Sequence, residues 1–367
     1  MKKIDYWLSQ KSLRKQFSDT MKTMSCRLLG VVLFFTAMLS YSVANNTDSL
    51  NTDSIQSELY KQIQGTDVVI STLDSALHAW ENRIRTYDTS KANEPNALLA
   101  RRIPGFSDSF FEQKLRQLDE TSPIAFTYNQ YVKPFIVLYA ADRRDQVERM
   151  MGRGHLYFPM FAQELDKRGL PLRLKYLPVI ESALNPQAVS SMGANGLWQF
   201  MYGTAKYIGL DISTYIDERR DPVKATEAAV GYLSDLHDIY EDWLLVIAAY
   251  NCGPGNVSKA IRRAGGSDQF WDVYPFLPRE TRGYVPAFIA AAHVMEHHEV
   301  YRLFPRALDI PMNTETIRIK GPMEFDMLAN SLNIDEPTLE ILNPSYKRSF
   351  IPGGGRSYTI RLPKKQA

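Results

Sequence analysis

Cysteine is almost absent from the sequence, and so is any apolar run long enough to cross a membrane. Only Cys26 and Cys252 occur among the 367 residues, which excludes a small scaffold held together by several disulfides. The apolar run from Leu28 to Leu39 has roughly 12 residues, whereas a spanning helix needs about 20. A large excess of charge of one sign is also missing, because the formal net charge is only +2. This balance gives no reason to expect a nucleic-acid partner.

The first 44 residues have the organisation of a signal peptide. Lys22 and Arg27 precede the apolar run, and Ser42 and Ala44 follow it in the small-x-small spacing that signal peptidase cleaves. Residues 1–44 are therefore predicted to be a signal peptide, with a retained membrane anchor as the alternative. We expect an exported protein in the periplasm or cell envelope, compatible with peripheral association with the envelope. Cleavage would leave a single cysteine, expected to be buried as a small apolar side chain.

Composition and periodicity divide the remaining chain into three parts. Residues 45–103 read as a polar linker with one helical segment. Residues 104–301 follow an almost wholly helical pattern, in which Asp221 and Asp242 are placed as helix N-caps. Residues 313–367 differ, because strand-like and helix-like patterns alternate there. The predicted fold class is therefore mainly α, with a small α+β module at the C-terminal end.

The module from residue 313 to 367 has a β-α-α-β order. Thr316–Lys320 and Tyr358–Leu362 alternate in hydrophobicity as short strands do. Phe325–Leu332 and Pro337–Leu342 have helical spacing between them. The whole pattern covers roughly 50 residues, which is small for a domain that must fold by itself.

Glu181 is the strongest candidate for a catalytic group. It follows the apolar stretch Leu174–Ile180, and the pair Asn185-Pro186 prevents a helix from continuing beyond it. Both the negative end of a helix dipole and apolar neighbours disfavour a carboxylate. We therefore predict a raised pKa, as a general acid near neutral pH requires. A solvated glutamate that closes a surface helix is the alternative.

A second catalytic carboxylate and a metal site are not evident. Asp211 and Asp217 lie in loop-like sequence, and Asp221 is explained as an N-cap, so a mechanism with a single acid fits better than a carboxylate pair. His293 and His297 have the i, i+4 spacing of a metal-binding pair, but no ligand set surrounds them. A solvated helix end is the favoured interpretation of these histidines and of His298.

Three segments resemble the lytic transglycosylases, whose catalytic domain is lysozyme-like. The sequence ESALNPQAVSSMGANGLWQFM begins at Glu181, AAYNCGPGNV ends at Val257, and LPRETRGYVPAFIAA begins at Leu277. The stretch upstream resembles the membrane-bound lytic transglycosylase D branch. The resemblance covers 104–301, with a catalytic core of about 160–301. Two departures, Tyr202 in place of a common proline and Cys252 in place of a common alanine, remove no reactive group.

The resemblance implies the chemistry and the site. In this family a lone glutamate, here Glu181, cleaves the β-1,4 bond between N-acetylmuramic acid and N-acetylglucosamine in peptidoglycan. A 1,6-anhydro ring forms, and no metal or organic cofactor is needed. The substrate-binding residues that the resemblance implies are Ser190, Gln199, Met201, Tyr250, Asn251, Glu280 and Tyr284.

Alternatives remain for the supporting residues and for the activity. Ser190 is equally explained as a turn residue, and Glu280 as a charge that stabilises the first turn of a helix. Tyr284 or Tyr250 is expected to donate a hydrogen bond to Glu181, which would restrain the rise of its pKa. The tail resembles a glycan-binding LysM module in its second half, with a packing or spacer role as the alternative. A muramidase that uses water, or a cell-wall binding protein without catalysis, are the competing functions.

Overall fold

The computed structural model describes residues 106–308 and 310–367 of the chain. Helices dominate the first range, and paired strands with two helices make up most of the second. The predicted fold class, mainly α with a small C-terminal α+β module, is confirmed. The expected signal peptide, 1–44, and the linker with its helical segment, 45–103, lie outside the described residues. Within the described part, no helix is long and apolar enough to span a membrane.

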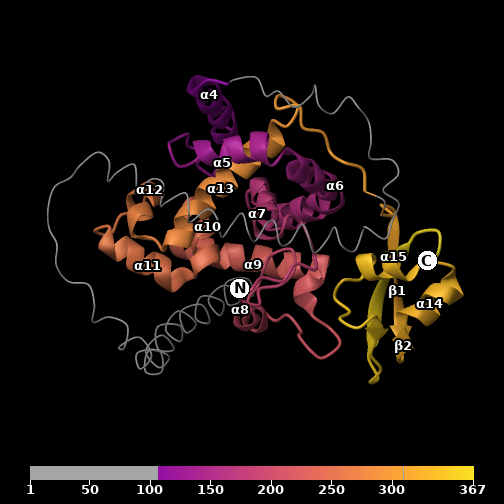
Figure 1. Ribbon diagram of the computed structural model, residues 1–367. Helices are drawn as coiled ribbons and strands as arrows, with labels where there is room; N and C mark the ends of the chain where they lie inside the picture. The colour runs from indigo at the N-terminus through magenta and orange to yellow at the C-terminus, as the bar shows by residue number, and fades with distance from the viewer. Residues whose placement is uncertain (1–105, 309) are drawn as a thin grey trace, which may run out of the picture. The chain divides into compact units, whose positions relative to one another are not determined.

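The helical part contains helices of very different length, from 3 to 24 residues, many of which begin or end at proline, glycine or capping residues (Figure 1). In chain order its helices are α4 Asp108–Asp119, α5 Lys133–Val137, η2 Leu138–Asp142, α6 Arg144–Lys167, η3 Leu172–Tyr176, α7 Leu177–Ser182, α8 Tyr202–Tyr207, η4 Glu218–Arg220, α9 Pro222–Tyr240, α10 Trp243–Cys252, α11 Pro254–Arg263, α12 Phe270–Val273, η5 Tyr274–Phe276 and α13 Arg279–Glu296.

Helix α10 lies in the middle of this part and is covered on several sides. All of its residues from Trp243 to Ala249 are buried, because a helix that is apolar all round has no face for water. Helices α9, α11 and α13 pack against it (Figure 1). The predicted N-caps are present: Asp221 accepts from the first turn of α9, and Asp242 from the first turn of α10.

Helix α13 is buried along most of its length and corrects one prediction. His293 was expected at a solvated helix end, but its side chain is 0% exposed. Its Nε2 lies 2.6 Å from the Tyr301 hydroxyl, and burial lowers the pKa of His293 to about 3, so the ring is neutral in the core. His297 and His298 follow at the C-terminal end and are only half-buried.

The C-terminal module has the predicted order of elements. Strands β1 and β4 pair in antiparallel register, with Ile317 opposite Ile360, and helices α14 and α15 lie beside them (Figure 1). A second ladder, β2 with β3, has only two residues in each strand and was not predicted, because so short a run shows no alternation. The elements are β1 Thr314–Lys320, β2 Met323–Glu324, α14 Phe325–Leu332, α15 Glu336–Leu342, β3 Phe350–Ile351 and β4 Ser357–Pro363.

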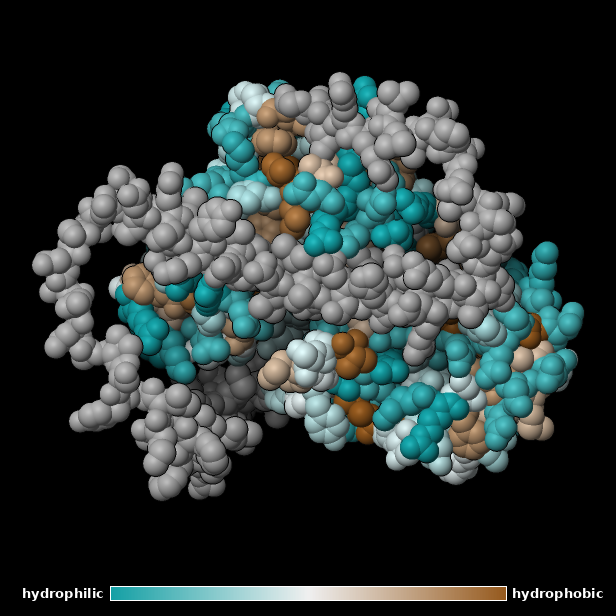
Figure 2. Space-filling model, viewed as in Figure 1, coloured by the Kyte–Doolittle hydropathy of each residue, from teal (hydrophilic) through white to brown (hydrophobic). Residues whose placement is uncertain are grey.

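The described surface is largely hydrophilic. In Figure 2, teal residues cover most of the visible described part, and brown residues form separate patches. Single exposed apolar side chains are normal for a globular protein. The most exposed of the large apolar side chains is Met192, at 78%.

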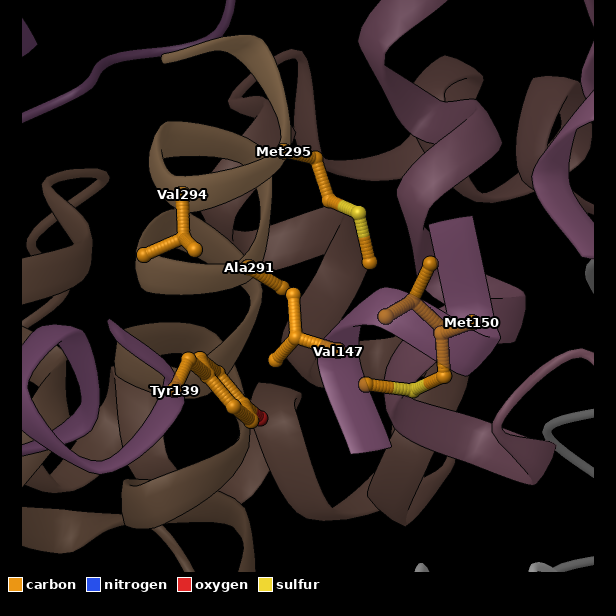
Figure 3. Close-up of a pocket in the computed structure, with 7 residues that line it drawn as sticks. Tyr139, Val147, Met150, Ala291, Val294 and Met295 are labelled. Carbon is orange, nitrogen blue, oxygen red and sulfur yellow. The ribbon is translucent and has the colours of Figure 1, made fainter. Parts of the chain in front are cut away.

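A small apolar packing defect lies among η2, α6, α7 and α13. Figure 3 shows Tyr139, Val147, Met150 and residues of α13 converging on it. The defect has no room for a water molecule. The hydroxyl of Tyr139 is buried and has no hydrogen-bond partner among the described residues, so it is a polar group desolvated without compensation.

We predict that Tyr139→Phe leaves the free energy of unfolding unchanged or raises it by up to about 1 kcal/mol, because an unsatisfied hydroxyl is removed. Tyr301→Phe is the matched control. It removes a buried hydroxyl that is paired with His293 and should cost about 1 to 3 kcal/mol. Urea unfolding of both variants tests this, and a clear loss of stability in Tyr139→Phe would show that its hydroxyl is paired.

Candidate active site

Glu181 lies in the last turn of α7, where the chain leaves the helix through two left-handed residues. Ala183 and Leu184 have φ angles of 50° and 59°, a region that is unfavourable for side chains larger than glycine. Their N–H groups donate to the carbonyls of Val179 and Pro178, both at 3.1 Å. The buried guanidinium of Arg153 donates to the Ala183 carbonyl at 2.8 Å. These bonds hold the strained turn that follows Glu181.

The Glu181 carboxyl is largely removed from water. Burial raises its pKa to about 7, and the hydrogen bond from Tyr284 acts in the opposite direction. The Tyr284 hydroxyl donates to Oε1 at 2.6 Å, so the predicted bond is present for Tyr284. The predicted rise in the pKa of Glu181 is also confirmed. Near neutral pH the group can therefore be protonated or ionised, as an acid–base catalyst requires.

Tyr250 does not make the same bond. Its hydroxyl donates to the Trp198 carbonyl at 2.7 Å. It nevertheless interacts electrostatically with the carboxylate. Burial raises the pKa of Tyr250 well above its usual value, and the charge of Glu181 raises it further. Tyr250 thus joins the neighbourhood of Glu181 to the loop that contains Trp198.

That loop, residues 193–200, is folded against the backbone of Arg219. Gly196 has a φ of 84°, and a Cβ added there would lie 1.7 Å from the Arg219 carbonyl oxygen. Only glycine can stand at this position. The Trp198 indole N–H donates to Thr226 at 2.9 Å, and the Trp198 side chain is 0% exposed. Trp198 is therefore a core residue of the loop.

A buried ionic network holds the loop, and the sequence analysis does not predict it. The Asp217 carboxylate accepts from Arg219 at 2.7 and 2.9 Å and from Asn195 at 3.0 Å. Burial acts to raise the pKa of Asp217, but the hydrogen bonds and charge of Arg219 outweigh it and the pKa is lowered. Arg219 also donates to the carbonyls of Gly193 and Phe200. An Asp-x-Arg pattern was the available signal, but it is too common in loops to identify such a network.

The remaining predicted site residues of the first segment lie on or next to this loop. Gln199, with a φ of 49°, donates its side-chain amide to the carbonyls of Ala188 and Gly196. Ser190 lies in a turn, where its hydroxyl accepts from the Ala194 N–H at 3.0 Å. Met201 is 43% exposed at the start of α8.

The other predicted residues lie at the facing ends of α10 and α13. The Asn251 side-chain oxygen accepts from the Thr281 hydroxyl at 2.9 Å, which ties the two helices together. Glu280 is exposed in the first turn of α13, whereas Tyr284, one turn later, is 3% exposed. Cys252 is half-buried against the core, and burial raises the pKa of its thiol. No cluster of three or more His, Cys, Asp or Glu in the described part of the chain is arranged to hold a metal ion.

Comparison with known families agrees with these features. Residues 159–271 match the family described as Transglycosylase SLT domain. Residues 313–367 match the LysM-like domain of lytic transglycosylase MltD. Over residues 159–271 the chain is therefore similar to transglycosylase SLT domains. More particularly, that region is followed by one similar to the LysM-like domain of the MltD type.

Known relatives share parts of the chain. Membrane-bound lytic murein transglycosylase D of Escherichia coli K12 is 33% identical over 219 residues, which is 59% of this chain and 48% of that protein. The chain thus spans about half the length of that relative. Soluble lytic murein transglycosylase of Escherichia coli K12 is 31% identical over 161 residues, 40% of this chain and 24% of that protein.

Solved structures include the lytic transglycosylase Slt of Pseudomonas aeruginosa, as an inactive mutant. It is 26% identical, with a TM-score of 0.32, over 40% of this chain and 24% of that one. The 70 kDa soluble lytic transglycosylase of Escherichia coli is 22% identical, with a TM-score of 0.37, over 53% of this chain and 31% of that one.

We predict that Tyr284→Phe raises the pKa of Glu181 above its value of about 7. A donated hydrogen bond favours the carboxylate, so its loss favours the protonated form. Tyr250→Phe is the control, since its hydroxyl donates to Trp198 instead. An NMR titration of the Glu181 side-chain carboxyl carbon measures the shift. An unchanged or lower pKa in Tyr284→Phe would exclude the bond.

A second prediction concerns stability. The pKa of Glu181 rises from 4.5 to about 7 on folding, so the folded state holds this proton more tightly than the unfolded state. The resulting contribution to the free energy of unfolding is fully present below pH 4.5 and is lost as pH rises through 7. Glu181→Gln has no charge to desolvate. Relative to this variant, wild type should lose about 3 kcal/mol between pH 4 and pH 8. Urea unfolding across this range tests it, and parallel curves would contradict a buried carboxyl.

Proposed function

We propose that the protein is a lytic transglycosylase, which cleaves the β-1,4 bond between N-acetylmuramic acid and N-acetylglucosamine in peptidoglycan and leaves 1,6-anhydromuramic acid ends. The observation that carries this proposal is the Glu181 carboxyl, with a pKa of about 7 and a hydrogen bond from Tyr284, within a transglycosylase SLT domain. The substrate class is that of the relatives, whose names call them murein transglycosylases.

In the first half of the reaction Glu181 acts as the acid. Tyr284 engages Oε1, so Oε2 carries the proton to the glycosidic oxygen. The bond between C1 of N-acetylmuramic acid and that oxygen breaks, and the departing glycan keeps the proton as a hydroxyl group. The carboxylate that remains accepts the Tyr284 hydrogen bond more strongly than the acid did.

In the second half the same group acts as the base. The Glu181 carboxylate takes the proton of the C6 hydroxyl of N-acetylmuramic acid. The C6 oxygen attacks C1 and closes the 1,6-anhydro ring, so Glu181 is protonated again and no water is consumed. The acid and the base are one residue, and the substrate supplies its own nucleophile.

The three aspartates considered as a second catalytic carboxylate are engaged in other interactions, which supports a mechanism with Glu181 as the single acid. Asp217 is paired with Arg219 in a buried network. The Asp211 carboxylate forms an ion pair with the Arg356 guanidinium, with 3.1 Å between oxygen and nitrogen. Asp221 caps α9. An inverting hydrolase would need a second carboxylate to activate water. This observation favours the transglycosylase over a muramidase of the same fold.

The remaining site residues are proposed to contact the glycan. Gln199, Met201 and Ser190 would do so from the loop side, and Asn251 and Glu280 from the ends of α10 and α13. Tyr250 would position the Trp198 loop beside Glu181. The LysM-like module is proposed to bind N-acetylglucosamine-containing strands, and residues 1–44 to export the protein to the periplasm or cell envelope.

We predict that Glu181→Gln lowers digestion of purified sacculi by at least about 10² to 10⁴-fold, because one group performs both proton transfers. Fold and sacculus binding should be retained, and circular dichroism and a pelleting assay are the controls. More than a tenth of wild-type activity in the variant would overturn the assignment of Glu181.

Product analysis separates the competing functions. Mass spectrometry of the fragments released by wild type should find anhydromuramic ends, which are lighter by one water than reducing ends. Reducing ends would identify a muramidase. Binding without any released fragment would identify a cell-wall binding protein.

A further inference from the structure

A hairpin of the catalytic part, residues 211–218, pairs with the LysM-like module. Ile216 forms an antiparallel bridge with Tyr346 of the module. Two backbone hydrogen bonds flank this pair, from the Asp217 N–H to the Ser345 carbonyl at 2.9 Å and from the Lys347 N–H to the Tyr215 carbonyl at 2.8 Å. The contact is a single antiparallel bridge between two segments outside the named strands, and its main-chain bonds fix which residues face each other.

The hairpin also supplies a side chain to the core of the module. Ile216 is 6% exposed and belongs to the same buried cluster as Phe325, Leu339 and Ile360. Burial of an aliphatic side chain of this size is a substantial part of the stability of so small a core. The module and the hairpin are therefore one packed unit.

Asp217, the next residue, contacts both the module and the catalytic part. Its backbone N–H is bound to the module, and its carboxylate holds Arg219 and Asn195. Arg219 in turn donates to the carbonyls of Gly193 and Phe200, at 2.9 and 3.1 Å. These two carbonyls lie at the two ends of the loop 193–200.

The loop is attached to the segment that contains the proposed catalytic glutamate. Ser182, which follows Glu181, donates its hydroxyl to the Leu197 carbonyl at 2.9 Å. Tyr250 binds the Trp198 carbonyl. Displacement of the loop would therefore alter the surroundings of the Glu181 carboxyl.

We propose that Asp217 is a positioning residue for the proposed reaction, and that the LysM-like module, through its pairing with the hairpin 211–218, holds the active-site loop 193–200 in place. The module is then a structural support of the active site in addition to any glycan that it binds. The catalytic part of this proposal depends on the proposed transglycosylase activity, whereas the mechanical coupling does not.

The test of the coupling uses the full chain with Ile216→Asp, which places a charge in the shared core and should separate the hairpin from the module. Hydrogen exchange is followed at Asn195 and Gly196, whose N–H groups donate to the carbonyls of Phe200 and Ala188. We expect exchange there to accelerate by about tenfold or more, because the opening is local. Ile239→Asp is the matched control, since Ile239 is 55% exposed on α9. It should leave exchange in the loop unchanged.

A second readout separates positioning from a general loss of folded protein. On short soluble glycan chains, which do not need the module as a binding site, Ile216→Asp should lower kcat by about tenfold, in line with the cost of misplaced catalytic groups. Water admitted beside Glu181 should lower the pKa of its carboxyl, because burial is what raises it. The alkaline limb of the pH–rate profile should then move to lower pH. A smaller folded fraction would scale the rate equally at every pH and would overturn the positioning role.

Two further variants keep the test decisive. Ile216→Ala is milder and replaces Ile216→Asp if the latter fails to fold, as judged by circular dichroism. Asp217→Asn removes the charge that Arg219 faces and should accelerate exchange in the loop while the module stays paired. If exchange changes only in the module and not at Asn195 and Gly196, the coupling is wrong. If wild type releases no anhydro fragments, the proposed activity fails, and the exchange experiment still decides the coupling.

Discussion

Removal of the Glu181 carboxyl from water is the constraint on which the rest of the site depends. Desolvation raises its pKa to about 7, and this holds only while the surrounding side chains keep their packing. Next to Glu181, α7 ends in two left-handed residues that Arg153 and the α7 carbonyls hold in place. Tyr284 limits the cost by one strong hydrogen bond. The fold thus maintains an unfavourable environment for a charge that the proposed reaction needs only briefly.

The surroundings of Glu181 are in turn fixed by a buried ionic pair. Asp217 and Arg219 are costly to bury, but their hydrogen-bonding capacity is directed at Asn195, Gly193 and Phe200. An apolar pair could fill the same space without specifying the loop conformation. The position of Gly196 against the Arg219 carbonyl shows how closely the two backbones approach. We infer that the pair determines where the loop lies, rather than adding net stability.

Local patterns in the sequence predicted the parts of the fold that local interactions determine. The caps at Asp221 and Asp242 and the end of α7 after Glu181 follow from side chains within a few residues. The same holds for the two longer strands and the two helices of the C-terminal module, though not for the short ladder of β2 and β3. Long-range contacts were not predictable in this way. The buried setting of His293 depends on Tyr301 and on helices distant in sequence, and the pairing of Ile216 with Tyr346 joins segments about 130 residues apart. The Tyr284 bond was anticipated only through the family resemblance, since no spacing links it to Glu181.

A pKa near 7 also bears on why one carboxyl could serve two steps. A pair of catalytic carboxylates works by separating two pKa values, so that one group is an acid and the other a base. A single group must be protonated before bond cleavage and ionised afterwards. Its pKa should then lie close to the working pH, because a lower value empties the acid form and a higher value weakens proton donation. Burial supplies the rise from 4.5 and Tyr284 opposes it, so the balance of these two effects suits Glu181 to both of the proposed roles.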